Sequence, residues 1–150
     1  MTRFGTEILR SEFPDDDGSA PAALLAALRW HAMHKSAMSA AAVMTELADS
    51  RLLVPVIARV DVRDERGADK DSHIASVIFE SRDGRRGLPA FTSVEALKQW
   101  QKDARPIAQH AHLVAASALD QGCDGVLLDM ASDHRWAVTG EALKRLARRQ

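Results

Sequence analysis

The sequence contains one cysteine, Cys123, and no long apolar run. A single cysteine excludes an internal disulfide and a thiolate-rich metal site. No apolar stretch approaches the roughly 20 residues that span a bilayer. The first residues, Met1–Glu7, also lack the apolar core of a secretion signal. We therefore expect a cytoplasmic protein with no membrane contact.

The chain also lacks an excess of either charge. It carries 20 lysines and arginines against 21 aspartates and glutamates, which gives a formal net charge of -1. Such a balance produces no overall attraction to nucleic acid or to anionic lipid. The segment Lys144–Arg149 is basic, but cations near a helix C-terminus also complement the helix dipole without any ligand. We do not expect nucleic-acid binding.

The composition that is present suits one globular domain. Hydrophobic residues make up 46% of the 150 residues and charged residues 27%, which is ordinary for a domain of this size. The first 19 residues show weak periodicity and include the acidic cluster Asp15–Asp17. We expect a flexible N-terminal arm over residues 1–19 and a single domain over residues 20–150.

Two helices are predicted at the start of the domain. Pro21 suits a first helical turn, and Leu24 and Leu28 then repeat at helical spacing. Ser36 or Ser39 could cap the second helix. Three further helices are predicted over 92–100, 112–121 and 141–149. The first of these begins with Thr92-x-x-Glu95, which has the pattern of a capping box.

Apolar runs predict a three-stranded antiparallel meander over 52–60, 73–80 and 87–91. A charged loop over 61–72 joins the first two strands, and Gly84 supplies the hairpin between the last two. Later strands are predicted over 105–109, 126–130 and 135–138. We therefore expect an α+β fold with a mixed sheet of about five to six strands and helices packed on it.

The apolar runs are nearly unbroken, which is typical of strands covered on both faces. We expect these residues to be mostly buried: Leu53, Val56, Ile57, Val60, Ile74, Val77, Ile78, Phe79, Leu127 and Leu128. On this interpretation Val77→Asp would bury an unpaired charge and destabilise the fold by several kcal/mol.

Several motifs occur in a distinctive order: Arg51–Val56, Gly67–Lys70, Asp83–Arg86, Leu88–Ser93, Glu95–Leu97 with Trp100, Ala104–Ile107 and Gly125–Asp129. Their order and spacing resemble the SseB N-terminal domain family, whose name stands for enhanced serine sensitivity. The resemblance covers the chain from about Ala22 to its C-terminus. It implies a bacterial, actinobacterial-type, cytoplasmic protein of α+β fold. It does not imply a mechanism, because the family has no firmly assigned biochemical activity.

Two histidine pairs invite a metal hypothesis. His31 and His34 are spaced i, i+3 on a predicted helix. His110 and His112 would share a face only if a strand continued through both, and a helix start at Ala111 would separate them. Zinc would need about two further ligands, and no His-Glu-x-x-His pattern supplies them. We expect no metal, no cofactor and no catalytic residue set.

Two classes of function stay open. The leading hypothesis is a non-catalytic protein-interaction domain, with Asp69 and Lys70 in a recognition loop held between two strands. Its partner cannot be identified from the sequence. Trp30, Met33 and Met38 lie on or beside short helices, so we also expect a homo-oligomer contact through the arm and these helices.

The alternative is a small-molecule-binding domain or small enzyme. Its polar site would lie where the meander meets the third helix. The candidate residues of this site are Arg59, Asp61, His73, Arg85 and Asp129.

Overall fold

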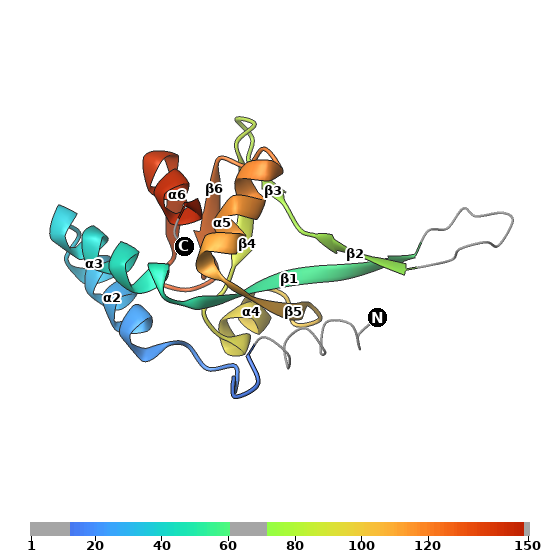
Figure 1. Ribbon diagram of the computed structural model, residues 1–150, viewed down its shortest axis with the longest axis horizontal. Coiled ribbons are helices and arrows are strands. Elements are labelled where there is room, and N and C mark those ends of the chain that lie inside the picture. The colour runs from blue at the N-terminus through green and yellow to red at the C-terminus, as the bar shows by residue number, and fades with distance from the viewer. Residues whose placement is uncertain (1–12, 61–71, 149–150) are drawn as a thin grey trace, which may run out of the picture.

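The computed structural model describes residues 13–60 and 72–148, and within them it describes residues 57–60 and 72–76 by their backbone alone. Its helices are α2 (Ala22–Met33), α3 (Ala37–Ala48), α4 (Val94–Trp100), α5 (Ala111–Asp120) and α6 (Gly140–Ala147). Its strands are β1 (Arg51–Val60), β2 (Ser72–Ser76), β3 (Phe79–Glu80), β4 (Arg86–Ala90), β5 (Arg105–His110), β6 (Gly125–Leu128) and β7 (Trp136–Thr139). The predicted α+β class is confirmed (Figure 1).

The strands form two sheets. The first has the order β2-β1-β5 and is antiparallel throughout. The second has the order β3-β4-β6-β7, in which only β4 and β6 run parallel, so it is mixed as predicted. Leu53 of β1 and Phe91 after β4 exchange two backbone hydrogen bonds of 2.8 Å each. This bridge ties the two sheets together.

The predicted strand over 73–80 is divided between the two sheets. Its first half is β2, which pairs with β1 as far as Val56 opposite Ser76. Val77 and Ile78 lie outside both strands, and β3 then pairs with β4. Each consecutive antiparallel pairing of the expected meander therefore exists, although the pairings belong to different sheets. On the N-terminal side of Val56, the same edge of β1 is bridged to Phe91 at Leu53, so β2 does not continue along it.

The main core lies between the second sheet and the helices that cover one of its faces. Figure 1 shows α5 and α6 packed beside β4 and β6. Inward-facing strand residues, among them Leu88, Val126 and Val138, are buried together with Val114 of α5 and Leu143 of α6. A smaller core forms under α4, where the buried residues are Leu53, Phe91, Leu97, Ala104 and Ala108.

The predicted burial of the strands is right for some residues and wrong for others. Leu53 and Leu128 are fully buried, whereas Val56, Val77, Ile78 and Leu127 are half-buried. Phe79 is exposed, with 38% of its surface accessible, because β3 is a two-residue edge strand. The side chains of Ile57, Val60 and Ile74 lie outside the description. A charge at Val77 would stay in reach of water, so the predicted penalty of several kcal/mol for Val77→Asp does not apply.

Two helix starts refine the predictions. Ser36, and not Ser39, caps α3: its hydroxyl accepts the Ser39 N–H at 2.9 Å, and the Ser39 hydroxyl accepts the Ser36 N–H at 3.0 Å. The predicted capping box at Thr92 is wrong by one residue. Ser93 caps α4 by accepting the Ala96 N–H at 3.0 Å. Thr92 is instead buried, and its hydroxyl donates a hydrogen bond to the carboxylate of Asp129 at 2.7 Å.

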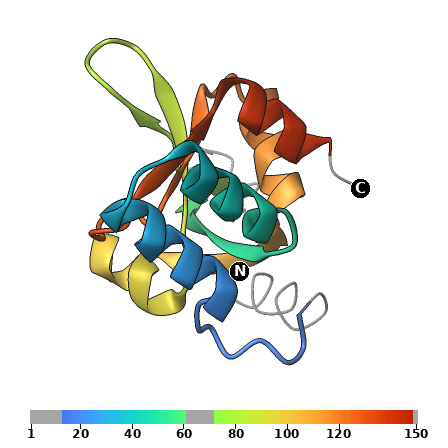
Figure 2. The ribbon, with the colours of Figure 1, turned by 90° about the vertical axis from the view of Figure 1, so that its left-hand side faces the viewer.

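Helices α2 and α3 form an antiparallel hairpin at one end of the molecule. Figure 2 shows the two helices side by side, with no other described element in front of them. The hairpin is anchored by His31, whose Nδ1 lies 2.6 Å from the Ser39 hydroxyl and whose ring meets the edge of Trp136. His34 lies in the exposed turn, so His31 and His34 do not share a face.

The expected N-terminal arm is described only from Phe13 onward, and this part contacts the domain. Phe13 packs against the smaller core and lies 5.0 Å from the ring of His110. The Gly18 carbonyl accepts the Val94 N–H at 2.9 Å. Residues 13–19 therefore form a strap along the start of α4.

Candidate functional site

A buried polar cluster lies where the parallel strands β4 and β6 end. The Asp129 carboxylate accepts the Thr92 N–H at 2.8 Å and the Thr92 hydroxyl at 2.7 Å. Its Oδ2 also lies 2.8 Å from Nε2 of His134. The Asp129 side chain is completely buried, and that of His134 is 15% exposed. Carboxyl ends of adjacent parallel strands are a common place for ligand sites.

The backbone of Asp129 is in the left-handed region, with φ of 47°. It is the only described residue other than glycine with a positive φ. The Asp129 carbonyl accepts the Ser132 N–H at 2.9 Å and the Ser132 hydroxyl at 2.8 Å, which closes the turn. Such conformations cost about 1–3 kcal/mol and persist only where surrounding contacts enforce them. At Asp129, the left-handed backbone directs the side-chain carboxylate towards Thr92 and His134.

A hollow of about 540 Å³, the strand-end pocket, opens above this cluster. Its walls come from the strap at residues 17–20, from α2 through Arg29, and from α4 through Glu95 and Gln99. Thr92, Asp129 and His134 line it as well. Because Asp129 occupies Nε2, the orientation of the imidazole is set, as it is for histidines held by a carboxylate in metal sites and triads.

Arg51 fastens the strap to this pocket. Its guanidinium donates to Asp16 at 2.6 and 2.8 Å, to the Thr92 carbonyl at 2.6 Å and to the Ser19 carbonyl at 2.9 Å. Both ion-pair side chains are about nine-tenths buried. The hydrogen bond from Arg51 holds the pKa of Asp16 below its ordinary value, against the opposing effect of burial. One wall of the strand-end pocket thus depends on one buried ion pair.

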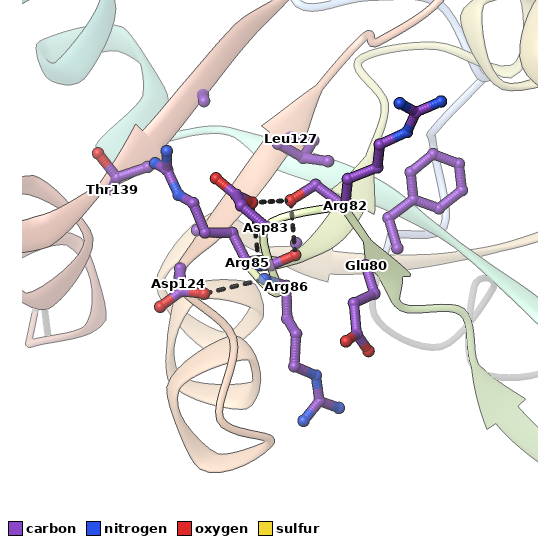
Figure 3. Close-up of a pocket in the computed structure, with 13 residues that line it drawn as sticks. Glu80, Arg82, Asp83, Arg85, Arg86, Asp124, Leu127 and Thr139 are labelled. Atoms are coloured by element: carbon purple, nitrogen blue, oxygen red, sulfur yellow. Dashed lines mark hydrogen bonds between the residues drawn. The ribbon is translucent and has the colours of Figure 1, made fainter.

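A second hollow, the hairpin pocket, lies beside the β3–β4 turn and has a volume of about 570 Å³. Leu127, Thr139, Arg82 and Arg86 are among the residues that line it. Figure 3 shows the side chains of these two arginines pointing apart. The arginines do not converge on one point, so they do not form a single anion site.

Two aspartates beside the hairpin pocket, Asp83 and Asp124, accept hydrogen bonds from the residues of the β3–β4 hairpin. Asp124 accepts the Arg86 N–H at 2.9 Å. Asp83 accepts the Ser81 hydroxyl and the Arg85 N–H, and these bonds, the hydroxyl first, lower the pKa of Asp83. Gly84 takes a φ of 87° in the turn, as the hairpin prediction requires. These contacts build the turn and leave an open, mixed-charge surface.

The outer side of the α2–α3 hairpin is a third candidate site. We call it the helical-hairpin face, and it consists of exposed residues on one side of both helices: Ala22, Ala23, Ala26, Trp30 and Met33 of α2, with Ala37, Met38, Ala41 and Thr45 of α3. Met33 and Met38 are 74% and 71% exposed, and Trp30 is 41% exposed. Arg29 is the charged residue at its edge. The face is therefore apolar and open.

The residues predicted for a polar site do not all meet. Asp129 lies at the predicted junction between the meander and the third helix, but Arg85 lines the hairpin pocket, and the two pockets share no lining residue. Arg59 and His73 are backbone partners across β1 and β2. Asp61 and the predicted recognition residues Asp69 and Lys70 lie outside the described residues.

Four residues that line the strand-end pocket or hold its wall were not predicted as site residues: Asp16, Arg51, Thr92 and His134. Asp16 is 35 positions from Arg51 and Thr92 is 37 positions from Asp129, so no local pattern links them. The one local signal was the spacing of five between Asp129 and His134. A turn was needed to bring those two side chains together, and its left-handed residue could not be inferred from the motif.

The second histidine pair, His110 and His112, lies at the start of α5. Helix α5 begins at Ala111, between His110 and His112, yet the two rings stack with centroids 5.6 Å apart. In the described part of the chain no three histidine, cysteine, aspartate or glutamate side chains gather as a metal site would require. Burial raises the pKa of the Cys123 thiol, which disfavours the reactive thiolate.

The described residues form a two-sheet α+β fold with several open hollows on its surface, among them the strand-end pocket and the hairpin pocket. A family model described as the SseB protein N-terminal domain matches residues 24–145, and the chain belongs to this family. No curated protein and no solved structure matches the chain. None of the described helices is long and apolar enough to cross a membrane. The actinobacterial type stays a prediction.

Proposed function

We propose that this chain is a non-catalytic protein-interaction domain that binds its partner through the helical-hairpin face. The observation that carries the proposal is the exposure of Trp30, Met33 and Met38 together on one side of α2 and α3. Tryptophan and methionine are enriched in protein interfaces, and methionine adapts readily to a partner surface.

The composition of the two helices supports the same proposal. A helix that is apolar on all sides is normally buried on all sides. Helix α2 has one arginine and one histidine in 12 residues, and α3 has one glutamate in 12. Their inner sides pack on the core through Leu24, Leu28 and Val43. Their outer sides have no described cover, and a protein partner would supply one.

Ala26→Glu is expected to weaken partner capture at least about tenfold, because it would place a charge at an apolar contact. The measurement is affinity capture from native extract with quantitative mass spectrometry. Ala26 is exposed, and glutamate is a good helix former, so the variant should keep its melting temperature. Leu113→Glu is the matched control, since Leu113 is 43% exposed on another helix.

Equal capture by the wild type and Ala26→Glu would overturn the proposal. The same assay tests the predicted recognition loop through a variant with Asp69 and Lys70 both replaced by alanine. That variant should lose partner capture if the loop is also a contact element.

A second candidate function is the binding of a small polar molecule in the strand-end pocket. The left-handed conformation of Asp129 favours it, since such strain is concentrated at functional sites. In this function His134 would donate or accept a hydrogen bond through Nδ1, with Arg29 and Gln99 as neighbouring polar groups.

Ligand-detected NMR on an ultrafiltrate of native extract tests this second function. Signals of a bound small molecule are expected with the wild type and should disappear with His134→Ala. The imidazole is partly exposed, so the circular dichroism spectrum of the variant should stay unchanged. An ultrafiltrate that gives the same signals with both proteins would speak against the pocket as a site.

A further inference from the structure

We infer that the partner on the helical-hairpin face is a second copy of this chain, packed face to face with its helices antiparallel to those of the first. In this dimer α2 lies over α2 of the partner and α3 over α3. The inference rests on the proposed function and names its partner.

Side-chain size is segregated along the helical-hairpin face. The large side chains Trp30, Met33 and Met38 lie in the last turn of α2 and the first turn of α3, next to the connecting turn. The opposite end carries small side chains: Ala22, Ala23 and Ala26 of α2, with Ala41 and Thr45 of α3. One half of the face is therefore raised and the other half is low.

A two-fold axis perpendicular to the helices turns this segregation into self-complementarity. It lays the raised half of each copy on the low half of the other, so that Met33 meets the partner's Ala22 and Trp30 lies near the partner's Ala26. Alanine allows close approach of helices, and a two-fold contact uses the same patch on both copies. A different protein would need a surface of its own with a matching raised half and low half. A second copy of this chain already has such a surface.

The other two-fold arrangement has its axis parallel to the helices and is disfavoured. It would stack raised half on raised half and leave a gap between the low halves. It would also bring Lys35 in the exposed turn close to the same lysine of the second copy. The antiparallel arrangement separates these lysines by about 18 Å, the length of a 12-residue helix. Side-chain size thus selects the antiparallel arrangement, and the separation of the two Lys35 side chains adds to this preference.

Sedimentation velocity tests whether the second copy is the partner. At high micromolar concentration, the wild type should sediment as a species with twice the chain mass of 16.4 kDa. Ala26→Glu should raise the dissociation constant of the dimer at least about tenfold, since it would bury a charge near the two-fold axis. Leu113→Glu should leave the dimer unchanged. A wild type that is monomeric at this concentration overturns the inference.

Engineered cysteines test the arrangement. When a Met33→Cys chain and an Ala22→Cys chain are mixed and mildly oxidised, the antiparallel dimer should form the mixed disulfide in preference to either homodisulfide. Native Cys123 is buried, and the wild type oxidised in parallel shows its background. Predominant Met33→Cys homodisulfides would overturn the antiparallel arrangement.

The two levels of the proposal fail separately. A monomeric wild type whose capture of another protein is lost on Ala26→Glu would refute the dimer and keep the protein-interaction function. A dimer unaffected by Ala26→Glu would show that the helical-hairpin face is neither the dimer contact nor the partner-binding surface.

Discussion

Replacing Arg51 with alanine is expected to lower the free energy of unfolding by about 3–5 kcal/mol, the usual cost of removing one member of a buried ion pair. Arg51 makes two bonds to Asp16 and one each to the carbonyls of Thr92 and Ser19. Alanine would leave the Asp16 carboxylate buried without its cation. Urea denaturation followed by circular dichroism measures the loss.

Arg51→Lys is the matched control, because it keeps the charge but cannot reproduce the two-point contact with Asp16. The free energy of unfolding of Arg51→Lys should lie between those of the wild type and Arg51→Ala. An Arg51→Ala protein within about 1 kcal/mol of the wild type would contradict the assigned role of this pair.

The same pair predicts an acid-side dependence of stability. The pKa of Asp16 is lowered in the folded state from its ordinary 3.8, chiefly by the hydrogen bond from Arg51. A lowered folded-state pKa means that the contribution is fully present above pH 3.8 and is lost as the pH falls through the folded value. Stability of Arg51→Ala should therefore decline less steeply over this acid range than that of the wild type.

Asp129→Ala is expected to cost about 3 kcal/mol, because each buried donor left without an acceptor costs roughly 1–3 kcal/mol. The variant would strand the N–H and the hydroxyl of Thr92 and would release His134. Alanine also tolerates the left-handed backbone less well than aspartate does. The measurement is again urea denaturation.

Asp129→Asn separates the parts of this effect. Asparagine suits a left-handed backbone and keeps an oxygen for the Thr92 N–H, but it gives the Thr92 hydroxyl and His134 a different partner. We expect a smaller loss of stability than for alanine. Equal losses for the two variants would mean that the Asp129 hydrogen bond to the Thr92 backbone contributes little.

Single residues show how far local sequence signals reach. A serine cap at the start of α3, at Ser36 or Ser39, and the glycine in the β3–β4 turn were predictable, because caps and tight turns are set by neighbours within a few positions. Thr92 resisted prediction for the opposite reason. Its sequence suits a capping box, yet Asp129, 37 positions away, takes its hydroxyl, and Ser93 caps the helix instead.

Strand burial shows the same division. An apolar run identifies a strand, but it does not say how many faces a neighbouring element covers. Phe79 and Leu128 belong to equally apolar runs, and only Leu128 lies under the helices of the main core. Phe79 falls on a short edge strand, because β1 is already bridged to Phe91 where a longer β2 would have continued.

By itself the sequence determined the α+β class, the approximate strands and helices, and the likeness to the family to which the chain belongs. These features follow from periodicity, turn residues and motif order, which act over short distances along the chain. Only the tertiary structure decided that the strands form two sheets, that Thr92, Asp129 and His134 line one pocket, and that no described element covers the outer side of α2 and α3. Each of these depends on contacts between distant segments, where packing and hydrogen-bond geometry choose among partners that local propensity leaves equivalent.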